Sequence, residues 1–241
     1  MTELLYQTDS YKREFEAAVI AVDIENGGVV LDRTAFYPGG GGQPPDMGRL
    51  EGSTGSWAAS GFKRTGGRLV HLLAGENENL PKEGEILTGR LDWERRYQLM
   101  RTHTAMHILC GVIYRDYGAP VTGGNMEPLS GRMDFEFETM RAELVGEIER
   151  AINVEVSESR DVRAAILPRE EAFQIPDLIR TKINLLPEGI REIRTVEIVG
   201  LDLQADGGTH VGNTAEVGEL KVVDYKSKGK INKRIYVQLV G

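Results

Sequence analysis

His103 and His107 are the residues of this chain whose types and spacing most directly suggest chemistry. If residues 92–118 form a helix, the two imidazoles lie about 40° apart around its axis and about 6 Å apart along it. Both rings can then reach one metal ion from the same face. A zinc peptidase is disfavoured, because the HExxH motif requires a glutamate where this chain has Thr104. The pair alone also fits an amphipathic helix with two partly buried rings.

A second candidate cluster lies in the sequence QADGGTHVGNT, residues 204–214. Asp206 and His210 flank a glycine-rich turn, and a carboxylate and an imidazole at this spacing could complete a tetrahedral N/O metal site. The same residues also fit an Asp-Gly-Gly turn with an exposed histidine nearby. The remaining histidine, His71, lies in the strand-like segment RLVHLL and is expected to be structural.

The elements that must position these residues change in character at Asp92. Before it, apolar runs surround an Asn26-Gly27-Gly28 turn, a hairpin signal, and a loop rich in Gly and Pro occupies residues 38–48. Further strand-like segments cover residues 68–73 and 85–91. This half is expected to be a small β-barrel or sandwich.

After Asp92, which can cap the helix, apolar residues recur at three- and four-residue steps until Gly118 and Pro120. One helical face is therefore expected to be buried. Strand patterns then alternate with a helix over residues 140–158; the expected strands cover residues 133–137, 161–167 and 193–205 and a C-terminal hairpin. The sequence predicts an α+β protein with two domains, residues 1–91 and 92–241.

The charge of the chain is uneven. Its 241 residues carry a net charge of −8. Residues 221–241 hold six basic residues against Asp224, a net +5, so the other 220 residues carry −13. Lys/Arg clusters contact phosphates through local charge, although this segment also fits a solvated hairpin tip. The basic residues considered for contact with a nucleic acid are Lys226, Lys228, Lys230, Lys233 and Arg234.

The single cysteine, Cys110, excludes an intramolecular disulfide and favours a reducing compartment. No uncharged apolar run approaches the roughly 20 residues of a membrane span, and the N-terminal residues are too polar for a signal peptide. A cytoplasmic protein is therefore expected.

Several motifs together resemble those of a known family. RTHTAMHIL followed by ADGGTHVGNTAEVG is similar to the editing domain of alanyl-tRNA synthetase and of the free-standing alanyl-tRNA editing proteins called AlaX. TAFYPGGGGQPPDMG resembles the Gly-rich motif of the medium-length form, and LDWERRYQLMRTHTAMH resembles the entry into the editing helix. The N-terminal YQTDSYKREFEAAV and the Lys-rich C-terminal segment also agree, so the resemblance covers nearly the whole chain in order.

The resemblance implies a zinc site made by His103, His107, Asp206 and His210. The family usually has Cys where this chain has Asp206. Zn²⁺ accepts a carboxylate oxygen at about 2.0–2.2 Å, but the change leaves open weaker binding, another divalent ion, or an unliganded Asp206. The resemblance also places Thr122 near the serine hydroxyl of the substrate and Gln43 beside the pocket, whereas the residues alone suggest a turn at Thr122.

The implied activity is hydrolysis of the ester that joins a wrongly attached amino acid to tRNA(Ala), with seryl-tRNA as first substrate and glycyl-tRNA as second. Zinc could either activate water or position the substrate amino group. The basic C-terminal residues would contact the tRNA. Two alternatives stay open: a tRNA-binding relative without hydrolytic activity, and a hydrolase for another mischarged tRNA such as Ser-tRNA(Thr).

Overall fold

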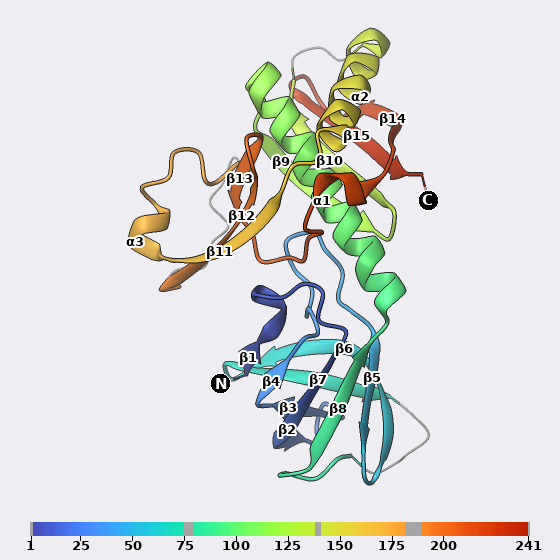
Figure 1. The fold of residues 1–241 in the computed structure, drawn as a ribbon, viewed down its shortest axis with the longest axis vertical. Helices are drawn as coiled ribbons and strands as arrows, with labels where there is room; N and C mark the ends of the chain where they lie inside the picture. Colours follow the sequence, from blue (N-terminus) through green and yellow to red (C-terminus); the bar gives the residue numbers. More distant parts are fainter. Residues whose placement is uncertain (1, 75–79, 138–140, 182–188, 241) are drawn as a thin grey trace. The chain divides into compact units, whose positions relative to one another are not determined.

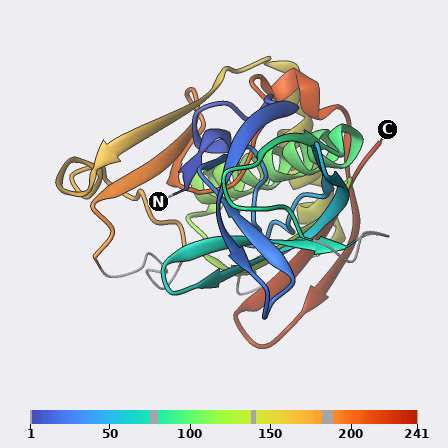
Figure 2. The ribbon, with the colours of Figure 1, turned by 90° about the horizontal axis from the view of Figure 1, so that it is seen from below.

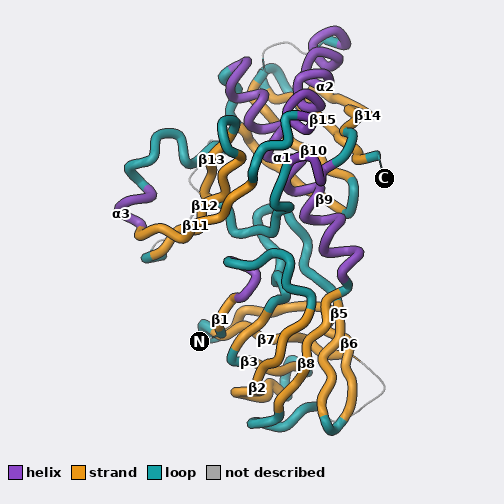
Figure 3. The backbone as a smooth tube through the Cα atoms, in the orientation of Figure 1, coloured by secondary structure: helices purple, strands orange, loops and turns teal. Residues whose placement is uncertain are grey.

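The computed structural model describes residues 2–74, 80–137, 141–181 and 189–240. The chain forms two compact units, one comprising residues 1–40 and 44–97 and the other residues 41–43 and 98–241. Figure 3 shows that strands dominate the first unit, whereas the second combines helices and strands. The predicted α+β class, with an N-terminal barrel followed by an α+β region, is confirmed.

The first unit is a closed six-stranded barrel with the strand order β2-β3-β7-β6-β5-β8. Figures 1 and 2 show its blue-to-teal strands curving around a common interior. The strands of the barrel are β2 (Glu14–Asp23), β3 (Gly28–Leu31), β5 (Gly48–Gly52), β6 (Gly55–Thr65), β7 (Arg68–Ala74) and β8 (Ile86–Leu91). Short strands β1 (Glu3–Leu4) and β4 (Arg33–Thr34) pair in parallel outside it, joined to the turn η1 (Leu5–Gln7).

The interior of the barrel is built by alternation along its strands. Phe15, Ala17 and Val19 of β2 are buried while their neighbours Glu14 and Glu16 are exposed, which is the period of two expected for a strand with one buried face. The predicted hairpin between β2 and β3 is confirmed, and Gly27 at its turn has φ +64°, a conformation that favours glycine.

A buried ion pair fixes the loop that leaves β4. Arg96, at the start of α1 (Trp93–Tyr117), contacts Asp46 with two nitrogens and also donates to the carbonyl of Ala35. Asp92 accepts a hydrogen bond from the Arg95 amide at 3.2 Å, as expected of a residue capping this helix.

The second unit contains two antiparallel sheets. The larger has the order β14-β15-β10-β9, and the smaller has the order β11-β12-β13. The strands are β9 (Val121–Glu127), β10 (Ser130–Glu136), β11 (Val162–Pro168), β12 (Glu192–Ile198), β13 (Asp202–Ala205), β14 (Leu220–Ser227) and β15 (Asn232–Leu239). The other elements are α2 (Ala142–Ser157), α3 (Arg169–Ala172) and η2 (Thr214–Val217).

Helix α1 is buried all round over residues 102–113, not on one face as the periodicity predicts. On one side a Cβ at Gly131 of β10 would lie 2.6 Å from Met106 Sδ, and on another a Cβ at Gly111 would lie 2.9 Å from Leu201. The helix therefore packs against both sheets, and this tertiary packing overrides the single apolar stripe expected of a surface helix.

Strand β9 corrects a second expectation. Its sequence VTGGNME lacks apolar alternation, and the turn that the residues suggest at Thr122 is instead part of this strand. Backbone pairing with β10, over Glu127↔Ser130 to Val121↔Phe135, holds the segment extended.

None of the helices in the described residues combines the length and apolarity that a membrane span requires.

Candidate metal centre

Two segments of the second unit bring together four groups that can bind a metal. His103 and His107 lie on consecutive turns of α1, with ring centroids 5.1 Å apart. Asp206 and His210 lie in the turn that follows β13. One ligand atom from each of the four residues lies within 4.8 Å of the others. The structure thus places all four predicted ligands in one cluster, and the three imidazoles are almost entirely buried.

The turn that carries Asp206 is held close to the helix. The Asp206 amide donates to the carbonyl of Arg194 on β12 at 3.0 Å, and Asp206 Oδ1 accepts from the Gly208 amide at 2.8 Å. A Cβ at Gly208 would lie 2.3 Å from the ring of His103. Glycine is therefore required at this position, because any side chain would enter the volume of a candidate ligand.

The carboxylate of Asp206 lies between two of the histidines. Its Oδ1 is 2.9 Å from His210 Nε2, and its Oδ2 is 3.5 Å from His103 Nε2. The rings of His103 and His210 are stacked with centroids 4.2 Å apart. The separation of Asp206 Oδ2 and His103 Nε2 is close to the edge of a tetrahedron whose corners lie about 2.0–2.2 Å from a central Zn²⁺, whereas the contact of Oδ1 with His210 Nε2 has the length of a hydrogen bond.

Each histidine has a different group beside its Nδ1 atom. Nδ1 of His103 lies 2.9 Å from Gln43 Oε1, and Nδ1 of His210 lies 3.2 Å from the Thr104 hydroxyl. Nδ1 of His107 lies 3.4 Å from Asp202 Oδ2.

With these groups beside Nδ1, Nε2 of each ring is the nitrogen that would bind a metal. In metal sites such outer partners fix the tautomer and orientation of a ligating imidazole. Nδ1 of His107 is buried and makes no aligned hydrogen bond to any described residue, so the carboxylate 3.4 Å away is the group available to it. The donor set of three nitrogens and one carboxylate oxygen fits Zn²⁺.

The electrostatics of the cluster favour neutral His103 and His210 and an ionised Asp206, whereas the pKa of His107 is raised by the carboxylates beside it. Burial lowers the pKa of His103 to about 4, and burial together with the neighbouring imidazoles holds the pKa of His210 well below its usual range. Burial raises the pKa of Asp206, but the surrounding histidines outweigh it and keep that pKa well below its usual range. Neutral imidazoles and an ionised carboxylate are the forms that coordinate metals.

Gln43 lies inside this cluster and links its two halves. Its Oε1 lies 2.9 Å from His103 Nδ1 and accepts from the Thr209 amide at 3.0 Å, while its Nε2 donates to the Thr209 hydroxyl at 2.9 Å. The side chain is buried, and its hydrogen-bonding partners are the candidate ligand His103 and Thr209 of the turn. The loop of residues 38–48 thereby supplies a positioning group.

Thr122 lies elsewhere in the second unit. Its hydroxyl donates to Asn232 Oδ1 at 3.2 Å, at the end of the four-stranded sheet. None of the hydrogen bonds among the described residues joins it to the four candidate ligands. Its predicted contact with a serine hydroxyl stays a prediction.

The basic residues of the C-terminal hairpin have different surroundings. Lys226, Lys228 and Lys230 are exposed, and Lys226 forms an ion pair with Asp224 at 2.9 Å. Lys233 is buried and donates to the carbonyls of Gly229 and Lys230.

Arg234 is tied to the neighbouring strand. Its guanidinium binds both oxygens of Asp134 at 2.6 and 2.7 Å. The described contacts therefore leave Lys228 and Lys230 as the cations with the most freedom to meet a ligand.

Three residues beside the centre are missed by the sequence analysis: Thr104, Arg194 and Asp202. Arg194 is buried and donates to the Asp206 carbonyl at 3.0 Å. Asp202 has a fully buried side chain next to His107. The sequence does give one indication of Asp202: it lies between Leu201 and Leu203 in an apolar stretch, where a buried carboxylate needs a partner.

Comparisons with known proteins place the chain among proteins of tRNA aminoacylation and editing. The family model described as tRNA synthetases class II (A) matches residues 6–95, and the model for the threonyl and alanyl tRNA synthetase second additional domain matches residues 193–236. An alanine–tRNA ligase of Ignicoccus hospitalis is 38% identical over 228 residues, which are 92% of this chain and 24% of the ligase. The chain thus falls in a class of tRNA synthetase-related modules.

Two free-standing relatives match along their whole length. The alanyl-tRNA editing protein AlaX-M of Saccharolobus solfataricus is 40% identical over 240 residues, with 98% of each chain covered. AlaX-M of Methanosarcina barkeri is 38% identical over 243 residues, with 100% of each chain covered. This chain belongs to the AlaX-M family of alanyl-tRNA editing proteins, which confirms the resemblance found in its motifs.

Proposed function

We propose that this protein is an aminoacyl-tRNA hydrolase that removes a wrongly attached amino acid from tRNA(Ala), serine first and glycine second. The observation that carries the proposal is the convergence of His103, His107, Asp206 and His210 within 4.8 Å in a member of the AlaX-M family. We assign the chemistry to the domain of residues 92–241, and we place the protein in the cytoplasm, where mischarged tRNA would enter translation.

The four residues would hold one Zn²⁺ through three Nε2 atoms and a carboxylate oxygen of Asp206. When bound, the ion can lower the pKa of a water or bind the amino group of the substrate. Gln43, Thr104 and Asp202 hold the imidazoles through Nδ1. Burial of the centre strengthens each of these electrostatic contacts, since the local dielectric constant is low.

Asp206 is the departure from the family pattern, and its surroundings support a role as ligand. Its oxygens face two imidazoles, and the Arg194 guanidinium lies 3.9 Å from Oδ1, close enough to balance its charge. A carboxylate is a harder ligand than a thiolate, so the site should accept Mn²⁺ or Co²⁺ more readily than a Cys-containing site.

The test is deacylation of Ser-tRNA(Ala) by purified protein, with the metal content measured on the same sample. We expect turnover by protein that holds one zinc per chain, slower turnover of Gly-tRNA(Ala), and none of Ala-tRNA(Ala). His103→Ala should lose both zinc and turnover. Tight tRNA binding without turnover by the zinc-loaded protein would favour the inactive relative, and preferential turnover of Ser-tRNA(Thr) would favour the other hydrolase.

A further inference from the structure

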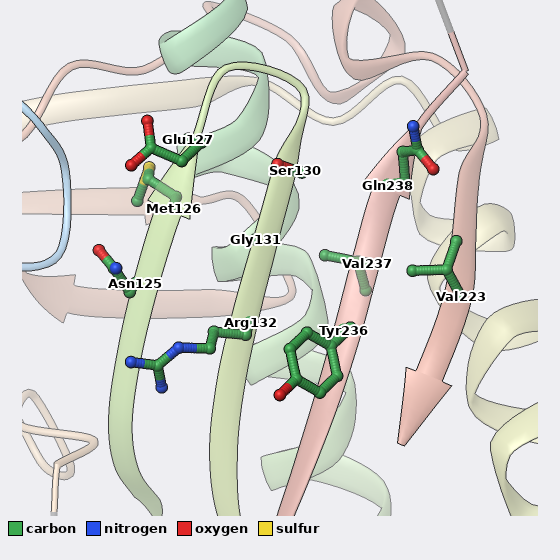
Figure 4. Close-up of a pocket in the computed structure, with 10 residues that line it drawn as sticks. All are labelled: Asn125, Met126, Glu127, Ser130, Gly131, Arg132, Val223, Tyr236, Val237 and Gln238. Atoms are coloured by element: carbon green, nitrogen blue, oxygen red, sulfur yellow. The ribbon is translucent and has the colours of Figure 1, made fainter. Parts of the chain in front are cut away.

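The larger sheet of the second unit has one face that its helix leaves open. Helix α1 covers the side that carries Met126, Gly131 and Met133, as the contact between Gly131 and Met106 shows. The residues that alternate with these along the strands, among them Asn125, Arg132 and Tyr236, project from the other side of the sheet, which we call the open face. Figure 4 shows α1 behind the strands and the pocket-lining side chains on and between them.

A row of planar polar groups crosses the open face. Arg132 of β10 pairs directly with Asn125 of β9 on one side and with Tyr236 of β15 on the other. Figure 4 shows Arg132 extending toward β9 and the Tyr236 ring between β10 and β15. Together with neighbouring residues, including Gln238 and Val223, these side chains line a shallow groove, open to solvent, with a volume of about 360 Å³. Sites of this size accept a small organic group such as a nucleotide.

Two aspartates near the open face are paired with basic residues, and the Arg132 guanidinium keeps hydrogen-bond donors for a ligand. Asp134 is neutralised by Arg234, and Asp224 by Lys226. The Arg132 guanidinium lies 3.7 Å from Asp134 and makes no hydrogen bond to a described residue, so its donors can meet a ligand.

The aromatic ring of the face also has a cation beside it. Lys226 Nζ lies 5.0 Å from the centroid of the Tyr236 ring. The exposed Lys228 and Lys230 extend the positive charge along the hairpin, and Glu127 is the opposing carboxylate in the groove lining.

The geometry points to the unpaired nucleotides at the 3′ end of the tRNA as the occupant of the open face; we propose that Tyr236 stacks on one base while Arg132 and Asn125 contact the adjoining base or phosphate. Single-stranded RNA is recognised by aromatic and guanidinium planes on open sheets, whereas duplex RNA keeps its base faces stacked. This inference rests on the proposed function, because it states where the tRNA substrate of that function would bind.

Strand β9 borders both the open face and the loop that reaches the candidate metal centre. The Met126 amide of β9 donates to the Gly42 carbonyl at 3.1 Å, and the next residue, Gln43, contacts His103. Neighbouring strands lie about 4.8 Å apart, so β15 and β9 are separated by roughly 10 Å across the sheet. A few consecutive nucleotides can cover that distance and then pass round the edge of the sheet at β9, because His103 and His107 lie on α1, on the opposite side of the sheet from the open face.

The experiment compares two substrates that differ only in the nucleotides before the terminal adenosine: Ser-tRNA(Ala) and 3′-O-seryl-adenosine. Stacking on one aromatic side chain contributes about 1–3 kcal/mol, so Tyr236→Ala should lower kcat/KM for the tRNA by roughly 5- to 150-fold. Arg132→Ala should lower it in the same way. Both variants should hydrolyse seryl-adenosine within twofold of the unaltered protein.

Matched variants separate stacking from folding. Tyr236→Phe keeps the ring and should retain tRNA activity within about threefold, and Lys82→Ala, an exposed lysine of the other unit, should change neither substrate. An equal loss on both substrates, or no loss on either, would overturn the inference.

A binding measurement keeps the inference testable if the unaltered protein hydrolyses neither ester. Fluorescence anisotropy with an oligonucleotide that ends in CCA should show weaker binding by Tyr236→Ala than by Tyr236→Phe. Failure of hydrolysis with this binding difference intact would reject the proposed function alone. Unchanged RNA affinity combined with an altered sedimentation coefficient would show that the face is a protein interface and would reject the inference.

Discussion

Nδ1 of His107 lies 3.4 Å from Oδ2 of Asp202, and both groups are buried. Arg180 Nε lies 3.2 Å from the other oxygen of this carboxylate, and the Arg180 guanidinium stacks 3.9 Å over the ring of Tyr114 on the same helix as His107. Burial lowers the pKa of His107, but Asp202 and the charge of Asp206 outweigh it and raise that pKa by stabilising the protonated ring. Because Asp202 lies beside Nδ1, Nε2 is the nitrogen of His107 that a metal would bind once the ring is neutral.

Replacing Asp202 with asparagine should weaken zinc binding by about 10- to 100-fold, the usual loss when an outer partner of a metal ligand is altered. The measurement is zinc affinity by competition with a chromophoric chelator. Asp161→Asn, which alters an exposed carboxylate, is the matched control and should bind zinc as the unaltered protein does. Equal affinities for the two variants would show that Asp202 does not position His107.

Alanine substitutions at Gly208 and at its neighbour Gly207 form a matched pair that tests how closely this turn approaches α1. A Cβ at Gly208 would collide with the His103 ring and with Gln43, whereas a Cβ at Gly207 would meet nothing within 4 Å. Gly208→Ala should therefore abolish stoichiometric zinc binding, and Gly207→Ala should leave it intact. Zinc content after gel filtration checks both, and retention of one zinc per chain by Gly208→Ala would refute the close approach of this turn to α1.

The role of Asp206 can be measured by restoring the family's usual ligand. Asp206→Cys should bind Co²⁺ with an intense near-ultraviolet thiolate charge-transfer band, because its sulfur would take the place of the carboxylate oxygen. The unaltered protein should show only weak d–d bands of tetrahedral Co²⁺. No thiolate band in a variant that binds one Co²⁺ would mean that residue 206 lies outside the coordination sphere.

His71 should make the barrel sensitive to acid. It is buried beside Thr34, and burial lowers its pKa to about 4. The unfolded chain takes up a proton near pH 6.5 and the folded chain does not, so stability should fall as the pH drops from 6.5 toward 4. Between pH 7 and pH 5 the loss from this residue should be about 2 kcal/mol.

Urea unfolding of metal-free protein at the two pH values tests the acid sensitivity. Both tryptophans, Trp57 and Trp93, belong to the barrel-containing unit, so their fluorescence reports its unfolding. His71→Gln cannot titrate in this range and should lose about 2 kcal/mol less than the unaltered protein. The same pH dependence in both proteins would remove His71 as the cause.

Local patterns predicted the elements whose residues agree with their final environment. Residues recurring at three- and four-residue steps and the Asp92 cap predicted α1, and the Asn26-Gly27-Gly28 turn predicted the first hairpin. Strand β9 could not be predicted, since its Thr-Gly-Gly-Asn segment is extended only through pairing with β10.

The candidate site divides in the same way. Its four metal-binding residues have chemistry that a sequence displays, and the motif order joined the two pairs. The resemblance names Gln43 as a pocket residue, but not its contact with His103, which lies 60 positions away in the sequence. Asp202 becomes a partner of His107 only when β13 lies against α1. Such contacts depend on tertiary packing, which one sequence does not contain.

The most direct test of the account is to titrate metal-free protein with zinc while measuring its deacylation of Ser-tRNA(Ala). We expect no turnover without metal, a rise in rate proportional to added zinc, and saturation at one zinc per chain. Full turnover by the metal-free protein, or no turnover by protein that holds one zinc and binds the tRNA, would contradict this expectation.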